Sequence, residues 1–179
     1  MVYIFLADGF EEIEALTQID YLRRAGIDII SVGIGGKRIK GAHGIEVTAD
    51  TTEDEISEDG IEMVILPGGL GGVDGIKSSK RALEVIRSCA ENGTFIAAIC
   101  AAPTILSQMG LLDGKRAVCY PSMSDELGNC IPCGERVAVD GKFITAIAAG
   151  ASEEFSFVLI EALCGKKAAE KVRAGIYAR

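Results

Sequence analysis

Four short and almost wholly apolar runs constrain most strongly what this chain can fold into. They occupy residues 2–7, 27–34, 62–66 and 94–99. Runs of this length, bounded by turn residues and without polar alternation, are typical of parallel strands buried on both faces. Stretches with apolar residues at helical spacing lie between them, such as residues 11–25 and 79–91. The pattern therefore predicts an α/β fold, with a mostly parallel sheet covered by helices on both faces.

The remaining elements follow from the same two periodicities. We expect a small β excursion at 38–40 and 45–48, a helix at 102–109, strands at 116–119, 136–140 and 142–146, and helices at 152–163 and 166–173. The glycine-rich stretch through Gly75 is expected to be a loop. The length of 179 residues, without a linker or internal repeat, indicates one domain over 1–179.

Charge and hydropathy exclude several classes of partner. The formal net charge is -8, and no basic stretch is present to neutralise phosphates, so we expect no nucleic-acid partner. No apolar run approaches the ~20 residues of a membrane span, and the first residues lack the basic start of a signal peptide. We therefore expect a cytoplasmic protein with no membrane partner, whose six cysteines are mostly reduced thiols.

Cys100 is the strongest candidate for a reactive group. It lies in TFIAAICAAPTIL, where the strand at 94–99 stops and a helix starts almost at once. Small residues flank it two positions away on each side, as in the nucleophile elbow of hydrolases. A helix N-terminus next to the sulfur would favour the thiolate. The alternative is a small buried hydrophobic side chain, which is the usual role of a free cysteine.

Three carboxylates crowd the start of the first predicted helix, in GFEEIEAL. A solvated first turn would explain Glu11 and Glu12. Glu14 could instead turn toward the strand ends, where a partly buried carboxyl group has a raised pKa and can share a proton with sulfur. The alternative for Glu14 is an ordinary surface position.

A glycine-rich segment, LPGGLGG, follows the strand at 62–66. Its backbone N–H groups, those of Gly68 and Gly69 among them, could point into a site as an oxyanion hole requires. It lacks the glycine spacing of a dinucleotide site, and we expect no helix directly after it. A plain flexible loop is the alternative.

Several other residues invite a chemical role. His43 is the only histidine, and its place in the β excursion favours an ordinary surface residue over the base of a Cys-His hydrolase. Cys130 and Cys133 have Cys-x-x-Cys spacing without a second pair or a nearby histidine, so no metal site is expected. They are either incidental thiols or a redox pair. Tyr120 follows the strand at 116–119, so its phenol could reach the same cleft.

Taken together, these segments resemble the ThiJ/PfpI superfamily, in the branch of the parkinsonism-associated deglycase. The similarity runs from residue 2 to about residue 173. The stretches that carry it are ADGFEEIEAL, DYLRRAGIDI, VILPGG, FIAAICAAPTIL, CYP, RVAVDGKFITA and SEEFSFVLIEALCGK. The resemblance implies a flavodoxin-like, Rossmann-like sheet of the class I glutamine amidotransferase type, and usually a homodimer.

The resemblance also implies site residues. Cys100 matches the family's nucleophile, which oxidises readily to a sulfinic acid, and Glu14 matches the glutamate hydrogen-bonded to it. The N–H groups of Gly69 and Ala101 match the oxyanion-binding donors, with Gly68 adjacent. Tyr120 stands where many members carry a histidine, and tyrosine, with a reference pKa of about 10, is a poor base near neutral pH.

Two further departures bear on function. Ala101 stands where the protease-like branch has a histidine, which argues against peptidase activity. The segment before the last long helix reads Ile147-Ala148-Ala149-Gly150 in place of the family's Arg/Gln-Gly-Pro-Gly. One wall of the pocket therefore differs from the family pattern.

The function that these residues imply is a cofactor-free glyoxalase III or deglycase acting on small reactive carbonyls such as methylglyoxal. Cys100 would attack the aldehyde and Glu14 would shuttle the proton, without a metal or glutathione. One alternative is a redox-sensing stress-response protein whose Cys100 oxidises to sulfinic acid with little turnover. Another is a binding module that has kept the fold and lost the chemistry.

Overall fold

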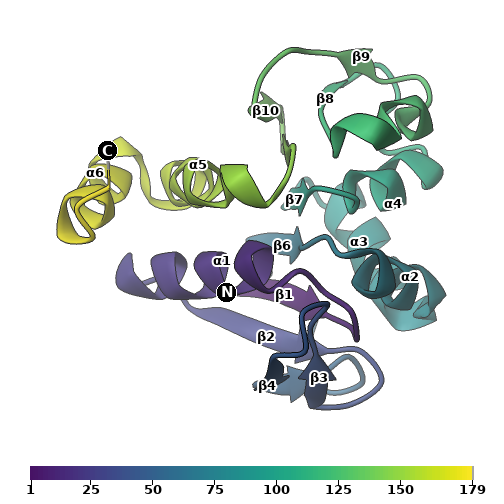
Figure 1. Ribbon diagram of the computed structural model, residues 1–179, viewed down its shortest axis with the longest axis horizontal. Helices are drawn as coiled ribbons and strands as arrows, with labels where there is room; N and C mark the ends of the chain where they lie inside the picture. The colour runs from purple at the N-terminus through teal and green to yellow at the C-terminus, as the bar shows by residue number, and fades with distance from the viewer. Residues whose placement is uncertain (179) are drawn as a thin grey trace.

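The computed structural model describes residues 1–178, and its centre is a seven-stranded sheet between two layers of helices (Figure 1). Six strands run parallel, and only the edge strand β10 is antiparallel to its neighbour. In spatial order the strands are β10 (Val137–Asp140), β11 (Phe143–Ala146), β7 (Phe95–Ile99), β6 (Met63–Leu66), β1 (Val2–Leu6), β2 (Ile29–Gly33) and β5 (Thr51–Thr52).

Helices cover both faces of this sheet, as the apolar runs predict. One face carries α1 (Glu12–Arg24), α5 (Ser152–Cys164) and α6 (Lys166–Gly175). The other carries α2 (Leu70–Ser78), α3 (Lys80–Glu91) and α4 (Pro103–Gln108). The antiparallel hairpin of β3 (Arg38–Lys40) and β4 (Glu46–Thr48) confirms the predicted β excursion.

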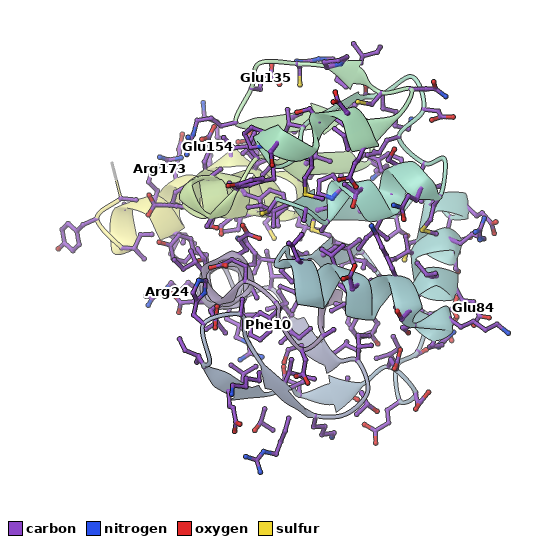
Figure 2. All side chains as sticks on the ribbon, turned by 45° about the vertical axis from the view of Figure 1, so that its right-hand side comes forward. Phe10, Arg24, Glu84, Glu135, Glu154 and Arg173 are labelled. Atoms are coloured by element: carbon purple, nitrogen blue, oxygen red, sulfur yellow. The ribbon has the colours of Figure 1, made fainter. Side chains whose placement is uncertain are left out.

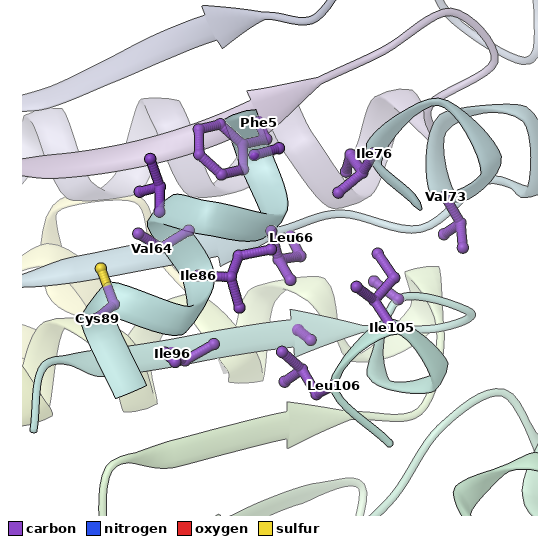
Figure 3. Packing of buried hydrophobic residues seen from close by; sticks show 14 of the residues in the cluster. Phe5, Val64, Leu66, Val73, Ile76, Ile86, Cys89, Ile96, Ile105 and Leu106 are labelled. Atoms are coloured by element: carbon purple, nitrogen blue, oxygen red, sulfur yellow. The ribbon is translucent and has the colours of Figure 1, made fainter. Parts of the chain in front are cut away.

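The central strands bury alternate residues in opposite layers, which explains why their sequences are apolar throughout. Val64 and Leu66 of β6 pack beneath α3 and α2, together with Ile96 of β7 (Figure 3). Met63 and Ile65 face the other way, toward α1 and α5. Each such side chain contributes about 1.5–3 kcal/mol to folding when fully buried. Among the described residues, no helix has the length and apolar character needed to cross a bilayer.

Strand register brings three loops together at one edge of the sheet. Leu66 pairs with Ala98, so the ends of β6 and β7 lie side by side. Ile4 pairs with Ile65, which aligns β1 with them. The segments that follow these three strands therefore meet at the carboxyl edge, where α/β sheets build their sites.

The structure corrects the expectation that no helix follows LPGGLGG, because α2 begins at Leu70, directly after Gly69. Its glycines are weak helix formers, and this hid the helix. They are needed for packing: a Cβ atom at Gly72 would lie 2.8 Å from the Phe10 Cα, and one at Gly75 would lie 2.5 Å from the Ala7 Cβ. The helix thus packs too closely against the first loop for larger residues.

The strand predicted at 116–119 is also different. Only β8 (Arg116–Ala117) forms, and it pairs with β9 (Ile131–Pro132) in a separate two-stranded sheet. After β8 the backbone leaves the strand pairing, and the Val118 N–H donates to a side chain, the Thr145 hydroxyl, at 3.0 Å. The chain then enters a 3-10 helix, η1 (Pro121–Leu127), which the sequence pattern did not predict.

Candidate active site

Cys100 lies at a strained turn immediately after β7. Its φ of 65° is in the left-handed region, which only one other non-glycine residue among those described adopts. Hydrogen bonds hold the turn on both sides: the Cys100 N–H donates to the Ala146 carbonyl at 2.9 Å, and its own carbonyl accepts from the Tyr120 N–H at 2.7 Å. A non-glycine residue persists in this conformation only where its surroundings impose it, as they do at functional sites. The geometry matches the predicted elbow.

Glu14 is fully buried on α1 and points toward Cys100, so the alternative of a surface position is wrong. Its Oε2 accepts a hydrogen bond from the Gly68 N–H at 2.8 Å. Its Oε1 has no hydrogen-bond partner of good geometry within residues 1–178. The groups next to this carboxyl group are the Cys100 thiol and the Ala149 N–H, which both favour its charged form.

One turn further along α1, Gln18 fixes the helix that carries Glu14. This buried amide donates to the Ser152 carbonyl at 3.1 Å and accepts from the Ser156 hydroxyl at 2.6 Å. Both partners lie on α5, so the two helices are held in a defined register. That register sets how deep Glu14 enters the site.

The expectation of a solvated first turn is wrong for Glu12, which is 4% exposed. Its carboxylate accepts hydrogen bonds from the His43 backbone N–H at 2.7 Å and lies 2.8 Å from the His43 Nδ1. Burial works to raise the Glu12 pKa, but these bonds outweigh it and the pKa is lowered. Glu12 therefore fastens the β3–β4 hairpin to α1. His43 itself is exposed, as predicted, and contacts this carboxylate rather than Cys100.

The loop after β6 brings two glycines against the Cys100–Glu14 pair. A Cβ atom at Gly68 would lie 2.5 Å from the Glu14 Oε2 and 2.6 Å from the Cys100 Cβ. Gly69 has a φ of 85°, and a side chain there would collide with the backbone of Gly9 and Glu11. The N–H groups of Ala101 and Gly69 interact with the Cys100 sulfur. Of the predicted donors, Gly68 is occupied by Glu14, whereas Gly69 of this loop and Ala101 at the turn face the sulfur.

Cys100 and Glu14 resist carrying two negative charges at once. Burial raises the pKa of Glu14 to about 7, although the contacts of its carboxyl group with Cys100 and the Gly68 N–H act to lower this pKa. Burial and the neighbouring Glu14 charge raise the pKa of Cys100 to about 12, although the Ala101 and Gly69 N–H groups oppose this. The predicted bias toward thiolate is therefore wrong, because burial and the Glu14 charge together outweigh the N–H groups of Ala101 and Gly69. Above about pH 7 the pair therefore holds one proton, on the sulfur, and transfer of that proton to Glu14 would leave a thiolate.

A cavity of about 550 Å³ opens above the sulfur. The sequence-predicted residues Gly69, Cys100, Ala101 and Tyr120 line it, and Tyr120 is 45% exposed. Five lining residues were not predicted: Glu11, Leu70, Ser122, Met123 and Glu126. Three of these belong to η1, whose short 3-10 turns carry no periodic signal.

The segment 147–150 contributes in a way that its sequence did not reveal. The Ala149 backbone N–H interacts with Glu14 and favours its charged form. It lies in the short 3-10 helix η2 (Ala149–Ala151), between β11 and α5. The departure from the family pattern therefore lies in direct contact with Glu14.

The other thiols lie outside this arrangement. All six cysteines are free. Cys119, Cys130 and Cys133 line a second cavity of about 300 Å³. The one group of described residues that could hold a metal ion is Glu11, Glu12 and His43, whose ligand atoms lie within 4.8 Å of one another. The hydrogen bonds of Glu12 already account for this cluster as a structural contact.

The sequence model of the DJ-1/PfpI family matches residues 1–162. The chain belongs to this family. Protein dj-1beta of Drosophila melanogaster is 37% identical over 97% of this chain and 94% of its own length. Its crystal structure superposes with a TM-score of 0.96, at 35% identity and 99% and 97% coverage of the two chains. The flavodoxin-like fold and the superfamily resemblance are thereby confirmed.

Two further DJ-1/PfpI relatives bear on chemistry. The structure titled Toxoplasma gondii DJ-1, oxidized, is 31% identical, with a TM-score of 0.95 over 99% of this chain and 97% of its own. A Pyrococcus abyssi protein named a deglycase is 29% identical over 81% of this chain and 88% of its own length. This DJ-1/PfpI chain is therefore similar both to a protein solved in an oxidised form and to one named for enzyme activity.

Proposed function

We propose that this protein is a cysteine-dependent, cofactor-free enzyme of the glyoxalase III or deglycase type, acting on small reactive carbonyls such as methylglyoxal. The observation that carries the proposal is the contact between buried Glu14 and Cys100, whose sulfur lines an open cavity. The similarity to a protein named a deglycase supports the same class of reaction.

In this mechanism Glu14 takes the thiol proton as the Cys100 sulfur adds to the aldehyde carbon. The carbonyl oxygen becomes an oxyanion, which the Gly69 and Ala101 N–H groups can stabilise, and protonation gives a hemithioacetal. Glu14 then moves the proton from the aldehyde carbon to the neighbouring carbonyl carbon through an enediol, which leaves a thioester. Water hydrolyses the thioester, so methylglyoxal plus water gives lactate and the free thiol.

Lactate formation from methylglyoxal tests the proposal. We expect turnover by the wild type and a loss of at least about 100-fold in Cys100→Ala and in Glu14→Gln, since each removes a reacting group. Cys164→Ala, which removes an exposed thiol at the end of α5, is the matched control and should keep full activity. Equal turnover by wild type and Cys100→Ala would overturn the enzyme proposal.

A redox-sensing role is the second candidate, and the solved oxidised relative favours it. Cys100 would pass through sulfenic to sulfinic acid, with the Gly69 and Ala101 N–H groups and protonated Glu14 holding the added oxygens. Mass spectrometry after mild peroxide should then show two added oxygens confined to Cys100. Oxidation spread evenly over all six cysteines contradicts this role.

The proposed assembly is a homodimer in the cytoplasm, with a small carbonyl as the only other partner. Two apolar side chains on α1, Ile13 and Leu16, are 56% and 36% exposed and support an interface beside the site. The single-domain organisation over 1–179 and the absence of cofactor and nucleic-acid partners stay predictions.

A further inference from the structure

The walls of the Cys100 cavity carry charge of one sign. Two of its lining residues, Glu11 and Glu126, are acidic. No lysine, arginine or histidine is found among the described residues that line it. The formal net charge of -8 adds a field of the same sign. A ligand that enters this cavity therefore meets negative potential before it meets the sulfur.

The two acidic residues differ in how far that charge is balanced. The Glu11 Oε2 lies 3.6 Å from the Nδ1 of His43, whose pKa is raised by its hydrogen bond to Glu12 and by the Glu11 charge. Glu126, in η1, forms no ion pair within residues 1–178. Its charge adds to the effects of burial and of Cys130 in raising the pKa of Cys119, which follows β8. Glu126 is thus the uncompensated charge at this cavity.

The rest of the lining is largely uncharged and apolar. Leu70, which is 69% exposed, Met123 and the Tyr120 ring face the opening, and Ser122 adds a hydroxyl. A volume of about 550 Å³ is in the range of sites that enclose drug-sized ligands. A three-carbon dicarbonyl would leave most of it unfilled. The cavity therefore has room for a carbonyl compound with an apolar body.

We propose that this cavity selects neutral and cationic carbonyl compounds over anionic ones, and that Glu126 imposes the selection. A substrate with an ammonium or guanidinium group is attracted, whereas an α-oxo acid is repelled. The carbonyl chemistry rests on the function proposed above. The charge selection acts while a ligand enters the cavity and approaches Cys100, so it can be measured without turnover.

The approach can be measured with methanethiosulfonate reagents of three charges: a trimethylammonioethyl, a methyl and a sulfonatoethyl derivative. In each case the Cys100 thiolate attacks the sulfenyl sulfur, a disulfide forms, and methanesulfinate leaves. Peptide mass spectrometry gives the rate at each cysteine. Exposed Cys164 in the same molecule is the internal reference, because it lies outside the cavity.

We expect the ratio of cationic to anionic rates at Cys100 to exceed that at Cys164 by about fivefold or more, the effect of a partly screened unit charge. Glu126→Gln should remove most of this excess, and Glu126→Lys should invert it. Glu84→Gln makes the same change in net charge on α3, where the side chain points outward, and should leave the ratio unchanged (Figure 2). Equal ratios at Cys100 and Cys164, or equal effects of Glu126→Gln and Glu84→Gln, would overturn the proposal.

Turnover then separates this proposal from the one on which it rests. Phenylglyoxals with a para trimethylammonium group, no substituent or a para carboxylate differ only in charge. Selective labelling without turnover of any of the three means that the enzyme proposal fails and the charge selection stands. Turnover with equal kcat/KM for the three means that the charge selection is wrong and the enzyme proposal stands.

Discussion

At the residue scale, Glu14 and Glu12 are two buried carboxyl groups on one helix whose pKa values shift in opposite directions. Glu12 accepts several hydrogen bonds, so its pKa is lowered and its charge stabilises the fold. Burial raises the pKa of Glu14 to about 7, although contacts with Cys100 and the Gly68 N–H act to lower it. Helical spacing puts them on different faces of α1, but it does not show which donors each one meets. The difference depends on what the loops after β3 and β6 donate to each.

This contrast predicts a pH-dependent gain in stability from Glu14→Gln. Between its ordinary pKa of 4.5 and about 7, the folded protein keeps a proton that the unfolded chain releases. The free energy of unfolding of the wild type therefore falls as pH rises through this window, by about 3 kcal/mol. Glu14→Gln lacks this loss, so urea unfolding should show it to be more stable than wild type by about 2–3 kcal/mol at pH 8, with no such gain at pH 4.

Glu12→Gln is the matched control, on the same helix turn and also with little exposed surface. Its lowered pKa means that the charge contributes stability above the unfolded value and loses it as the pH falls. This variant should therefore be less stable than wild type at pH 8. A Glu14→Gln variant that loses stability at pH 8, as Glu12→Gln does, would contradict this account of the site.

At the scale of elements, the loop between β6 and α2 owes its sequence to close packing. Gly68 leaves no space for a Cβ atom beside Glu14 and Cys100, and the glycines of α2 leave none beside the first loop. The same glycines made the segment resemble a flexible loop in the sequence. Strands β1, β6 and β7 were predictable because burial on both faces demands continuous apolar runs. The cavity wall formed by η1 was not, because a short 3-10 helix has no periodic pattern in the sequence.

Gly68→Ala should therefore damage both the fold and the site. The added methyl group would force Glu14 or Cys100 to move, at a cost of about 1–3 kcal/mol in the free energy of unfolding. Methylglyoxal turnover should fall sharply even under conditions where the variant is fully folded. Gly134→Ala, where nothing lies within 4 Å of the new Cβ, is the control and should stay within about 0.5 kcal/mol of wild type. Equal stability and turnover in the two variants would show that Gly68 is not under this constraint.

At the scale of the whole molecule, the sequence predicted the sheet, its two helical layers and the edge where the site forms. These depend on burial and on the short-range rules of α/β folds. The Cys100–Glu14 pair was harder to predict, because the sequence is equally consistent with an unreactive buried thiol and a surface carboxylate. The structure places Glu14 in the interior, with α1 bonded to α5 through Gln18 and the Glu14 carboxylate bonded to the Gly68 N–H.

The homodimer prediction belongs to this scale. Sedimentation velocity should give a dimer for the wild type. Replacing Ile13 and Leu16 of α1 by serine should shift it toward monomer, because the apolar surface that would be buried is lost. Ile131→Ser, which removes a similarly exposed apolar side chain on β9, should leave the dimer intact. A wild-type monomer at all concentrations would exclude the homodimer.

The left-handed φ of Cys100 also limits how this protein could evolve. A single nucleotide change converts a cysteine codon to serine, glycine, arginine, tyrosine, phenylalanine or tryptophan. Only serine and glycine are small enough for a position packed against Gly68, and glycine relieves the backbone strain. In a lineage without selection for reactivity, we therefore expect glycine to replace Cys100 and to stabilise the fold by relieving this backbone strain. Descendants that keep this architecture without its reactivity should therefore carry glycine at the elbow.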